Sequence, residues 1–365
     1  MVRHNKHIDN VPVYKPGKPI EEVQREFGLD EVVKLASNEN PYGCSLFVKK
    51  AVENEAVHLN RYPDGGAYYL RKKLASFLSV EEDEIIFGNG SNEVLDMIAR
   101  VFLNPDSEAV MFEGSFIVYK IVSMLQGAKV KEVPLEENFQ RDLNKLLGAI
   151  TDKTSVVFID NPCNPTGVAN FKEEFDEFIR NLPDHVILVL DEAYFEYAKS
   201  HNVPDGINYI HPINPKIPKK NVIITRTFSK AYGLAGLRIG YGVADKNIIS
   251  KLERVRQPFN TNRLAQVAAL EALKDQAFVK FSVEMNEKQK EYLYEELEKL
   301  GICYVPSYAN FIMFKSPKED LYNKLLEKGV SIRPAFGFDG YLRVSIGTPE
   351  ENERFVKNLK ETLQK

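Results

Sequence analysis

The residues from Thr227 to Arg238 have the types and the spacing to bind a phosphate beside a reactive amine. Thr227 and Ser229 offer hydroxyl groups, Lys230 follows at once, and Arg238 stands eight positions further on. A lysine with a lowered pKa forms Schiff bases with carbonyl compounds. A cofactor with both an aldehyde and a phosphate is pyridoxal 5′-phosphate (PLP), an electron sink for carbanions. The segment therefore predicts a PLP site with Lys230 on the aldehyde.

The same segment also fits a plainer interpretation, a strand and a turn with solvated basic residues. Most single lysines are exposed, so Lys230 alone carries little weight. The closely spaced glycines from Gly233 onward permit unusual backbone dihedrals and close backbone approach. A simple surface turn seldom needs several of them, which favours the phosphate site.

Other apolar runs also end in polar side chains that could face such a cofactor. The run over 186–190 ends in Asp191, with Tyr194 three residues later, and the run over 155–159 leads into Asn164. The carboxyl ends of parallel strands form the ligand crevice of an α/β sheet. A carboxylate there favours the protonated form of a ring nitrogen, so Asp191 is a candidate partner of that nitrogen. The alternative for Asp191 alone is a helix N-cap.

Two further features indicate anion binding. Gly88 to Glu93 forms a glycine turn between a strand and a helix, where free N–H groups attract a phosphate. Arg343 interrupts an apolar strand, and a buried arginine needs an anion, for which a carboxylate has the matching geometry. Ser91 could equally be a simple N-cap.

These motifs resemble, in order from Asn38 to Thr348, those of class II fold-type I PLP-dependent aminotransferases. The strings over 35–41 and 342–348 are similar to those of the histidinol-phosphate aminotransferases in that family. The resemblance implies an α/β fold, a fold-type I PLP-dependent transferase. Its large domain has a mixed, mostly parallel seven-stranded sheet between helices, and a smaller α/β C-terminal domain follows. It divides the chain into 1–35 (an N-terminal arm and part of the small domain), 36–256 (the large PLP-binding domain) and 257–365 (the small C-terminal domain).

The resemblance also assigns site residues. Lys230, Asp191 and Tyr194 become the catalytic residues. The cofactor-binding residues become Ser91, Asn92, Phe116, Asn164, Asp191, Tyr194, Thr227, Ser229, Lys230 and Arg238, with Tyr62 reaching the phosphate in a neighbouring subunit. The substrate-binding residues become Arg343 for a carboxylate and Arg333 for a phosphate, with Tyr14 and Asn38 nearby. The family more often has aspartate where Asn92 stands and tyrosine where Phe116 stands.

The implied reaction interconverts L-histidinol phosphate plus 2-oxoglutarate with imidazole acetol phosphate plus L-glutamate. This ping-pong transamination belongs to histidine biosynthesis, and the resemblance implies a homodimer. An aromatic amino-acid aminotransferase and a threonine-phosphate decarboxylase are the alternatives within PLP chemistry. A non-catalytic PLP-fold sensor is disfavoured because Lys230 and Asp191 are both present.

Composition restricts the kinds of partner, cellular location and metal site that this chain could have. The 365 residues carry a net charge of −4 without a long basic run, which disfavours nucleic acid as a partner. No apolar run approaches a membrane span, and the first residues lack the apolar core of a signal peptide. Three scattered cysteines predict a reducing cytoplasm and, with the spacing of the histidines, no metal site.

The expected elements alternate between strand and helix. The pattern predicts a helix over 68–78, strands over 84–87, 109–112, 155–160 and 222–225, and a hinge over 257–262. Helical spacing over 264–300 predicts one long helix. The run over 330–334 is expected to be a single strand.

Overall fold

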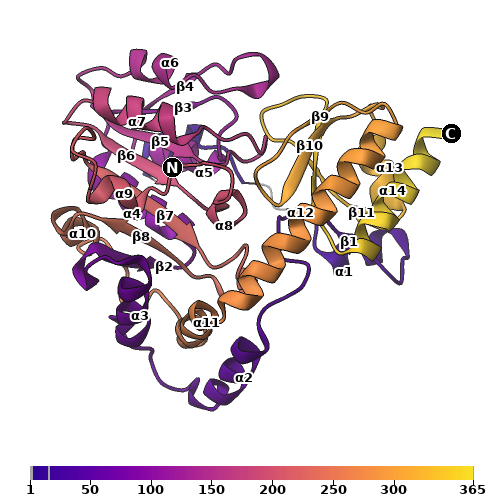
Figure 1. The fold of residues 1–365 in the computed structure, drawn as a ribbon, viewed down its shortest axis with the longest axis horizontal. Helices are drawn as coiled ribbons and strands as arrows, with labels where there is room; N and C mark the ends of the chain where they lie inside the picture. The colour runs from indigo at the N-terminus through magenta and orange to yellow at the C-terminus, as the bar shows by residue number, and fades with distance from the viewer. Residues whose placement is uncertain (1–2, 15–16, 365) are drawn as a thin grey trace.

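The structure, a computed structural model, describes residues 3–14 and 17–364 and has two lobes joined by a long helix (Figure 1). The larger lobe contains a seven-stranded sheet, and the smaller lobe contains a four-stranded and a two-stranded sheet. Met1, Val2, Lys15 and Pro16, which belong to the predicted N-terminal arm, lie outside the described residues, as does Lys365. The predicted domain boundaries at residues 36 and 257 stay a prediction.

The seven-stranded sheet confirms the predicted mixed, mostly parallel architecture. Its strand order is β2-β8-β7-β6-β5-β3-β4, with β8 antiparallel to both neighbours and every other pair parallel. The strands are β2 (Ile85–Gly88), β3 (Glu108–Phe112), β4 (Lys129–Val133), β5 (Thr154–Asp160), β6 (Ile187–Asp191), β7 (Val222–Thr227) and β8 (Gly240–Ala244).

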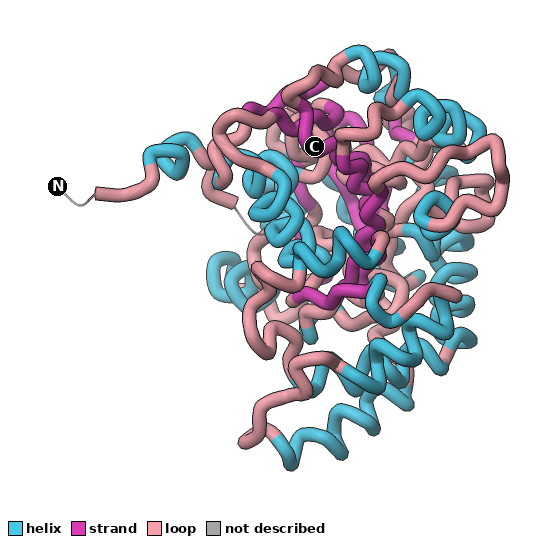
Figure 2. The backbone as a smooth tube through the Cα atoms, turned by 90° about the vertical axis from the view of Figure 1, so that its left-hand side faces the viewer, coloured by secondary structure: helices cyan, strands magenta, loops and turns pink. Residues whose placement is uncertain are grey.

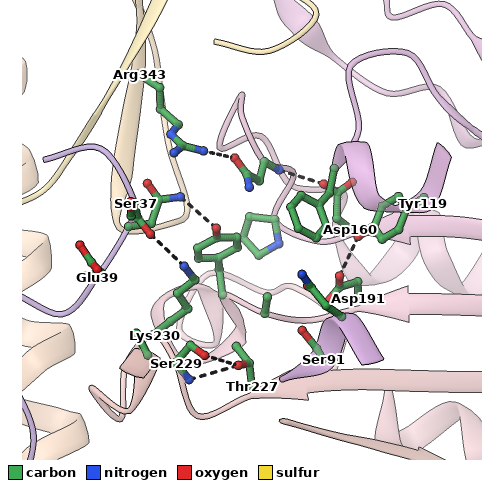
Figure 3. A pocket seen from close by; sticks show the side chains of 18 of the residues that line it. Ser37, Glu39, Ser91, Tyr119, Asp160, Asp191, Thr227, Ser229, Lys230 and Arg343 are labelled. Carbon is green, nitrogen blue, oxygen red and sulfur yellow. Dashed lines mark hydrogen bonds between the residues drawn. The ribbon is translucent and has the colours of Figure 1, made fainter. Parts of the chain in front are cut away.

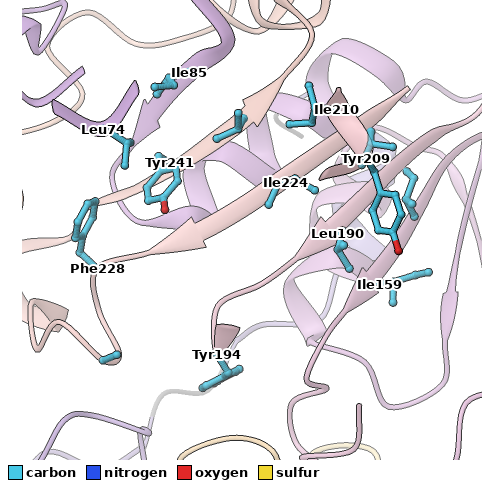
Figure 4. Packing of buried hydrophobic residues seen from close by; sticks show 14 of the residues in the cluster. Leu74, Ile85, Ile159, Leu190, Tyr194, Tyr209, Ile210, Ile224, Phe228 and Tyr241 are labelled. Atoms are coloured by element: carbon cyan, nitrogen blue, oxygen red, sulfur yellow. The ribbon is translucent and has the colours of Figure 1, made fainter. Parts of the chain in front are cut away.

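Helices cover both faces of this sheet (Figure 2). Successive residues of a strand point to opposite faces, so Ile159 and Leu190 pack in one apolar cluster while Phe158 and Val189 pack in another. Figure 4 shows the first cluster spanning neighbouring strands. The helices that pack on it include α2 (Leu46–Glu55), α3 (Tyr68–Leu78), α6 (Leu143–Gly148), α7 (Lys172–Asn181), α8 (Phe195–Ala198), α9 (Ile207–Ile210) and α11 (Arg263–Lys274). The second cluster is covered by α4 (Ser91–Phe102), α5 (Ile117–Leu125) and α10 (Lys246–Leu252).

The smaller lobe combines the C-terminal part of the chain with an N-terminal strand. Its four-stranded antiparallel sheet has the order β12-β13-β10-β9, and β1 pairs in parallel with β11. Its strands are β1 (Val33–Lys34), β9 (Tyr304–Val305), β10 (Phe311–Lys315), β11 (Val330–Ser331), β12 (Arg333–Pro334) and β13 (Tyr341–Ser345). The accompanying helices are α1 (Ile20–Phe27), α12 (Gln276–Lys299), α13 (Leu321–Glu327) and α14 (Pro349–Gln364).

Two predicted elements were wrong in their continuity. The expected single helix over 264–300 is two helices, α11 and α12, because Asp275 leaves the helical conformation (φ −99°, ψ 70°). Its side chain instead accepts a hydrogen bond from the N–H of Phe278 and caps α12. The expected strand over 330–334 is divided between two sheets, since β11 pairs with β1 while β12 pairs with β13.

One stretch, residues 35–40, passes from the smaller lobe to the larger, and we call it the crossing segment. Leu35 is held in the smaller lobe, where its N–H donates to Ser331 and its carbonyl accepts from Ser345. At the other end the Asn40 amide donates to the carbonyl of Ala231, the residue after Lys230, at 3.0 Å. The segment therefore ties both lobes to the neighbourhood of Lys230.

None of the helices in the described ranges is long and apolar enough to cross a membrane.

Candidate active site

A cavity of about 280 Å³ lies where residues of both lobes meet the crossing segment (Figure 3). With the exception of Tyr62, every predicted site residue lines it. These are Tyr14, Asn38, Ser91, Asn92, Phe116, Asn164, Asp191, Tyr194, Thr227, Ser229, Lys230, Arg238, Arg333 and Arg343. The fold thus gathers side chains that are up to 329 positions apart in the sequence, from Tyr14 to Arg343.

Lys230 stands in the turn after β7 and reaches into this cavity. Its Nζ donates to the carbonyl of Ser37 in the crossing segment at 3.1 Å. Burial, and after it the positive charge of Arg343, lower the pKa of Lys230 to about 8. Near neutral pH a fraction of this lysine is therefore the free amine, which acts as a nucleophile or a base.

Hydroxyl, guanidinium and backbone N–H groups converge below Lys230. Thr227 Oγ1 and Ser229 Oγ lie 2.9 Å apart, and Arg238 Nη1 lies 3.4 Å from Ser229 Oγ. Helix α4 begins beside them at Ser91, with its first N–H groups directed outward as in any helix N-terminus. A Cβ atom on Gly90 would lie 2.3 Å from Arg238 Nη2, so only glycine leaves room for that side chain. The group has the donors and the positive charge that a phosphate requires.

Asp191, at the end of β6, is buried and only partly hydrogen-bonded. Its Oδ2 accepts from the Tyr119 hydroxyl at 2.8 Å, while Oδ1 has no hydrogen bond within the described chain. Burial raises the pKa of Asp191 to about 6, and the hydrogen bond from Tyr119 works against this rise. A buried carboxylate with one oxygen still open is suited to a cationic ring nitrogen.

Tyr194 and Asn164 both present donors to the cavity. The Tyr194 hydroxyl oxygen accepts from Asn38 Nδ2 at 2.9 Å, and no described residue receives the Tyr194 proton. Arg343 Nη1 donates to Asn164 Oδ1, which leaves the NH₂ group of Asn164 without a protein acceptor in the described ranges. Two donors are therefore available for a ring oxygen.

Phe116 completes the surroundings of the cavity from the N-terminus of α5. Its ring lies 5.7 Å from that of Tyr119 in an edge-to-face arrangement. An aromatic face at the cavity wall is suited to stacking on a flat heterocycle.

Two arginines face one another at the small-lobe side of the cavity. Arg333 on β12 and Arg343 on β13 are directly paired across the antiparallel strands, where like charges repel. Arg343 is 7% exposed and donates to the carbonyl of Ala36 at 2.7 Å, while Arg333 donates to the Tyr14 hydroxyl at 3.3 Å. Burial, together with the charge of Arg333, lowers the pKa of Arg343 to about 10. An anion between them would relieve the repulsion.

Among the cavity residues that sequence reasoning missed, Tyr119 and Asp160 bear on the chemistry. Asp160 is buried, pairs with Arg141 at 3.2 Å and accepts the N–H of Asn164 at 2.9 Å, so it orients the turn that carries Asn164. A signal existed for both residues. Asp160 ends a buried strand as Asp191 does, and Tyr119 follows Phe116 by three positions on one helical turn.

Tyr62 lies outside this cavity. Its side chain is 78% exposed and stacks on Phe259, with 4.7 Å between the ring centroids. Its predicted role concerns a second subunit and stays a prediction.

The donor set fits PLP group by group. The phosphate-type donors, the open Oδ1 of Asp191, the donors of Tyr194 and Asn164 and the amine of Lys230 all border one cavity. In the described part of the chain, by contrast, no cluster of three or more His, Cys, Asp or Glu side chains could hold a metal ion.

The chain is similar to known proteins over nearly its whole length. The family model for aminotransferase class I and II matches residues 30–359. The histidinol-phosphate aminotransferase of Bacillus licheniformis is 46% identical over 363 residues, covering 98% of this chain and 99% of that protein. That of Bacillus subtilis strain 168 is 44% identical over 366 residues, covering 99% and 100%.

Solved structures share the fold. The histidinol-phosphate aminotransferase from Sinorhizobium meliloti in complex with pyridoxal-5′-phosphate superposes with a TM-score of 0.90 at 27% identity, covering 100% of this chain and 98% of that one. An aspartate aminotransferase from Thermotoga maritima reaches a TM-score of 0.85 at 21% identity, covering 99% and 100%. The fold is thus common to structures named for different substrates.

Proposed function

Because the chain belongs to the class I and II aminotransferase family, a PLP-dependent family, we propose that it is the transaminase of L-histidinol phosphate. The reaction interconverts L-histidinol phosphate and 2-oxoglutarate with imidazole acetol phosphate and L-glutamate, in histidine biosynthesis. Relatives of that name at 44–46% identity over nearly the whole chain support this assignment. PLP supplies the electron sink for the carbanion that forms when the substrate loses a proton.

The observation that carries the substrate assignment is the facing pair of Arg333 and Arg343. Both line the cavity that contains Lys230, and they place two positive charges directly opposite one another across paired strands, which favours anionic groups of the substrate there. A transaminase that alternates between glutamate and a phosphorylated amine must bind a carboxylate in one half-reaction and a phosphate in the other, within the same cavity. We assign the carboxylate of glutamate to Arg343 and the phosphate of the amine to Arg333, with Tyr14 and Asn38 close by.

The residues that would hold PLP follow from their chemistry. Thr227, Ser229, Arg238 and the N–H groups of Ser91 and Asn92 would bind its phosphate. Phe116 would stack on the ring, Asp191 would face the ring nitrogen, and Asn164 and Tyr194 would donate to the ring oxygen.

Lys230 is the base that removes the proton from Cα of the substrate. Its pKa of about 8 keeps part of the population neutral near physiological pH, as general base catalysis requires. The carbonyl of Ser37 accepts from Nζ and so holds the amine at the cavity wall.

The active form is proposed to be a cytoplasmic homodimer in which Tyr62 contacts the partner's phosphate site. Large apolar side chains between residues 46 and 69 are more than half exposed in the single chain, which supports a subunit interface there. They are Leu46, Phe47, Val57, Leu59, Tyr62, Tyr68 and Tyr69. Conversion of Tyr62 to Phe should weaken PLP binding without changing the sedimentation of the dimer.

Steady-state kinetics with two amino donors tests the function. The enzyme should convert histidinol phosphate in the presence of 2-oxoglutarate far faster than it converts phenylalanine. An equal or faster rate with phenylalanine would overturn the proposal in favour of an aromatic aminotransferase.

Two matched variants separate the arginines. Arg333→Gln should raise KM for histidinol phosphate by about 10–100-fold, the size of a lost hydrogen bond to a charged group, and leave KM for glutamate nearly unchanged. Arg343→Gln should raise KM for glutamate. The assignment fails if Arg333→Gln affects both substrates alike.

A further inference from the structure

Ser345 lies on β13 two positions after Arg343, and therefore on the same face of the strand. It is 3% exposed and outside the set of predicted site residues. Both hydrogen bonds of its hydroxyl go to one residue, Asn38 in the crossing segment. The hydroxyl accepts from the Asn38 backbone N–H at 2.8 Å and donates to Asn38 Oδ1 at 3.0 Å.

The direction of these bonds is set by the backbone. A main-chain N–H can only donate, so the Ser345 oxygen is an acceptor there and the Ser345 proton goes to Asn38 Oδ1. The amide of Asn38 is then turned with Nδ2 toward Tyr194, to which it donates at 2.9 Å. With the amide reversed, the buried Ser345 proton would have no acceptor within the described ranges, which is costly.

Asn38 has little freedom to leave this position. Its backbone is in the left-handed region at φ 54°, which asparagine tolerates better than most residues. Its carbonyl accepts from Asn310 Nδ2 at 3.1 Å. All four polar groups of Asn38 are thus used, and its N–H, C=O and Oδ1 are held from the smaller lobe.

Tyr194 receives the end of this chain of hydrogen bonds. Because its oxygen accepts from Asn38, its own proton must point elsewhere, and no described residue accepts it. Tyr194 lines the cavity beside Lys230 and Asp191.

We propose that Ser345 is a positioning residue that fixes the direction of the hydrogen-bond chain through Asn38, so that the Tyr194 hydroxyl donates to the ring oxygen of bound PLP. The inference rests on the proposed function only through the role given to Tyr194, and not on the identity of the substrate. A serine on a small-lobe strand thereby controls a proton on the large lobe.

The test is a pH titration of the visible absorbance of bound PLP in the holoenzyme without substrate. A donor to the ring oxygen favours its anionic form, so loss of that donor raises the pH at which the absorbance changes. Tyr194→Phe should raise this pH by about one unit, the value of a hydrogen bond to a charged group. Ser345→Ala should shift it in the same direction by a part of that amount, because the Asn38 amide is then free to turn over.

A double variant shows whether Ser345 acts by orienting the Tyr194 hydroxyl or only by supporting the local fold. In the Tyr194→Phe background, Ser345→Ala should cause no further shift, because no hydroxyl remains to be oriented. Ser345→Thr keeps a hydroxyl, so the absorbance of bound PLP should change at the same pH as in the wild type. If Ser345→Ala does not fold, Asn38→Asp is the second variant. An aspartate accepts from both Ser345 and Tyr194, so it should raise the pH, and part of this shift should vanish in the Tyr194→Phe background.

The possible outcomes test the role of Ser345, the role of Tyr194 and the substrate assignment separately. A shift with Tyr194→Phe but none with Ser345→Ala or Asn38→Asp overturns the inference. A Ser345→Ala shift that persists fully in the Tyr194→Phe background also overturns it, since the effect would not pass through Tyr194. No shift with Tyr194→Phe itself refutes the role of Tyr194 and the inference with it. Failure to convert histidinol phosphate refutes the substrate assignment alone, because the titration needs only bound PLP.

Discussion

Two consecutive acids at the end of β6, Asp191 and Glu192, point into different surroundings. Asp191 faces the cavity, where a tyrosine hydroxyl holds one oxygen and the other has no hydrogen bond within the described chain. Glu192 faces away and is 1% exposed. Arg226 donates to its Oε2 from Nε at 2.8 Å, and the N–H of Gly206 donates to its Oε1 at 2.8 Å.

Burial alone does not distinguish the two acids. It raises the pKa of Asp191 to about 6 and that of Glu192 to about 7, although Arg226 opposes the second rise. The difference lies in the partners. Glu192 has a fixed cation and filled acceptor positions, whereas Asp191 has a neutral donor and a free oxygen. A perturbed carboxylate with spare capacity indicates a ligand site, and a fully partnered one indicates structure.

The largest effect is expected from breaking the structural side of this comparison. Arg226→Met leaves Glu192 buried without its cation, so the free energy of unfolding of the apoprotein should fall by about 3–5 kcal/mol. Urea denaturation measures the change. The double variant Glu192→Gln with Arg226→Met should regain part of the stability, because position 192 then carries no unpaired charge, while Asp205, the other carboxylate that pairs with Arg226, is more exposed than Glu192. A loss below about 1 kcal/mol would show that the pair is not structural.

The reverse pattern is expected on the cavity side. Asp191→Asn keeps the size of the side chain and its bond to Tyr119 but removes the charge that is proposed to face the ring nitrogen of PLP. kcat should fall by about 10²–10³-fold, the cost of one preorganised electrostatic contact, while the unfolding free energy of the apoprotein stays the same or rises. Glu192→Gln is the matched control. It should lower the unfolding free energy and leave kcat nearly unchanged, the opposite of Asp191→Asn. Equal losses of stability in the two variants would erase the distinction.

The pH dependence of stability sharpens the comparison on the Asp191 side. The folded pKa of about 6 lies above the ordinary value of 3.8, so between these values the folded apoprotein keeps a proton that the unfolded chain has released. This group therefore contributes stability at low pH that is lost as the pH rises through about 6. The advantage of Asp191→Asn over the wild type should grow from pH 4 to pH 7 by up to about 3 kcal/mol. Urea titrations at several pH values measure it, and a constant difference would contradict the raised pKa.

Sequence reasoning reached the cavity because its motifs are local. Lys230 with Thr227, Ser229 and Arg238 lies within twelve positions, and Asp191 ends an apolar run. The alternation of strands and helices was predicted for the same reason, since periodicity is a local property.

Part of what sequence reasoning missed depends on contacts between distant segments. Nothing near Ser345 in the chain indicates that it holds Asn38, 307 positions away. The break at Asp275 is instead local: apolar spacing continues across it, and the non-helical backbone of Asp275 with its capping bond to Phe278 marks the new start. The division of 330–334 between two sheets is set by its partners, β1 and β13.

The smallest effect is expected from removing the hydrogen bond of Tyr119 to Asp191. This neutral donor is what Asp191 has in place of the arginine that binds Glu192. Tyr119→Phe keeps the ring stacked on Phe158, with 5.0 Å between centroids, and removes the donor to Asp191 Oδ2. The donor favours the ionised carboxylate, so its loss should raise the pKa of Asp191 further and move the acidic limb of the kcat–pH profile to higher pH. Stability should change by only about 1 kcal/mol, as for one ordinary hydrogen bond.

Tyr209→Phe is the matched control for this variant, because Tyr209 is also buried and donates to a carboxylate, that of Asp176, at 2.8 Å. It should cost a similar amount of stability and leave the acidic limb where it is, since Asp176 does not line the cavity. If both variants move the limb alike, the shift reflects a general loosening of the fold. If neither variant moves the limb, Asp191 does not set it. The oxygen of Asp191 that has no hydrogen bond would then not distinguish Asp191 functionally from the fully hydrogen-bonded Glu192.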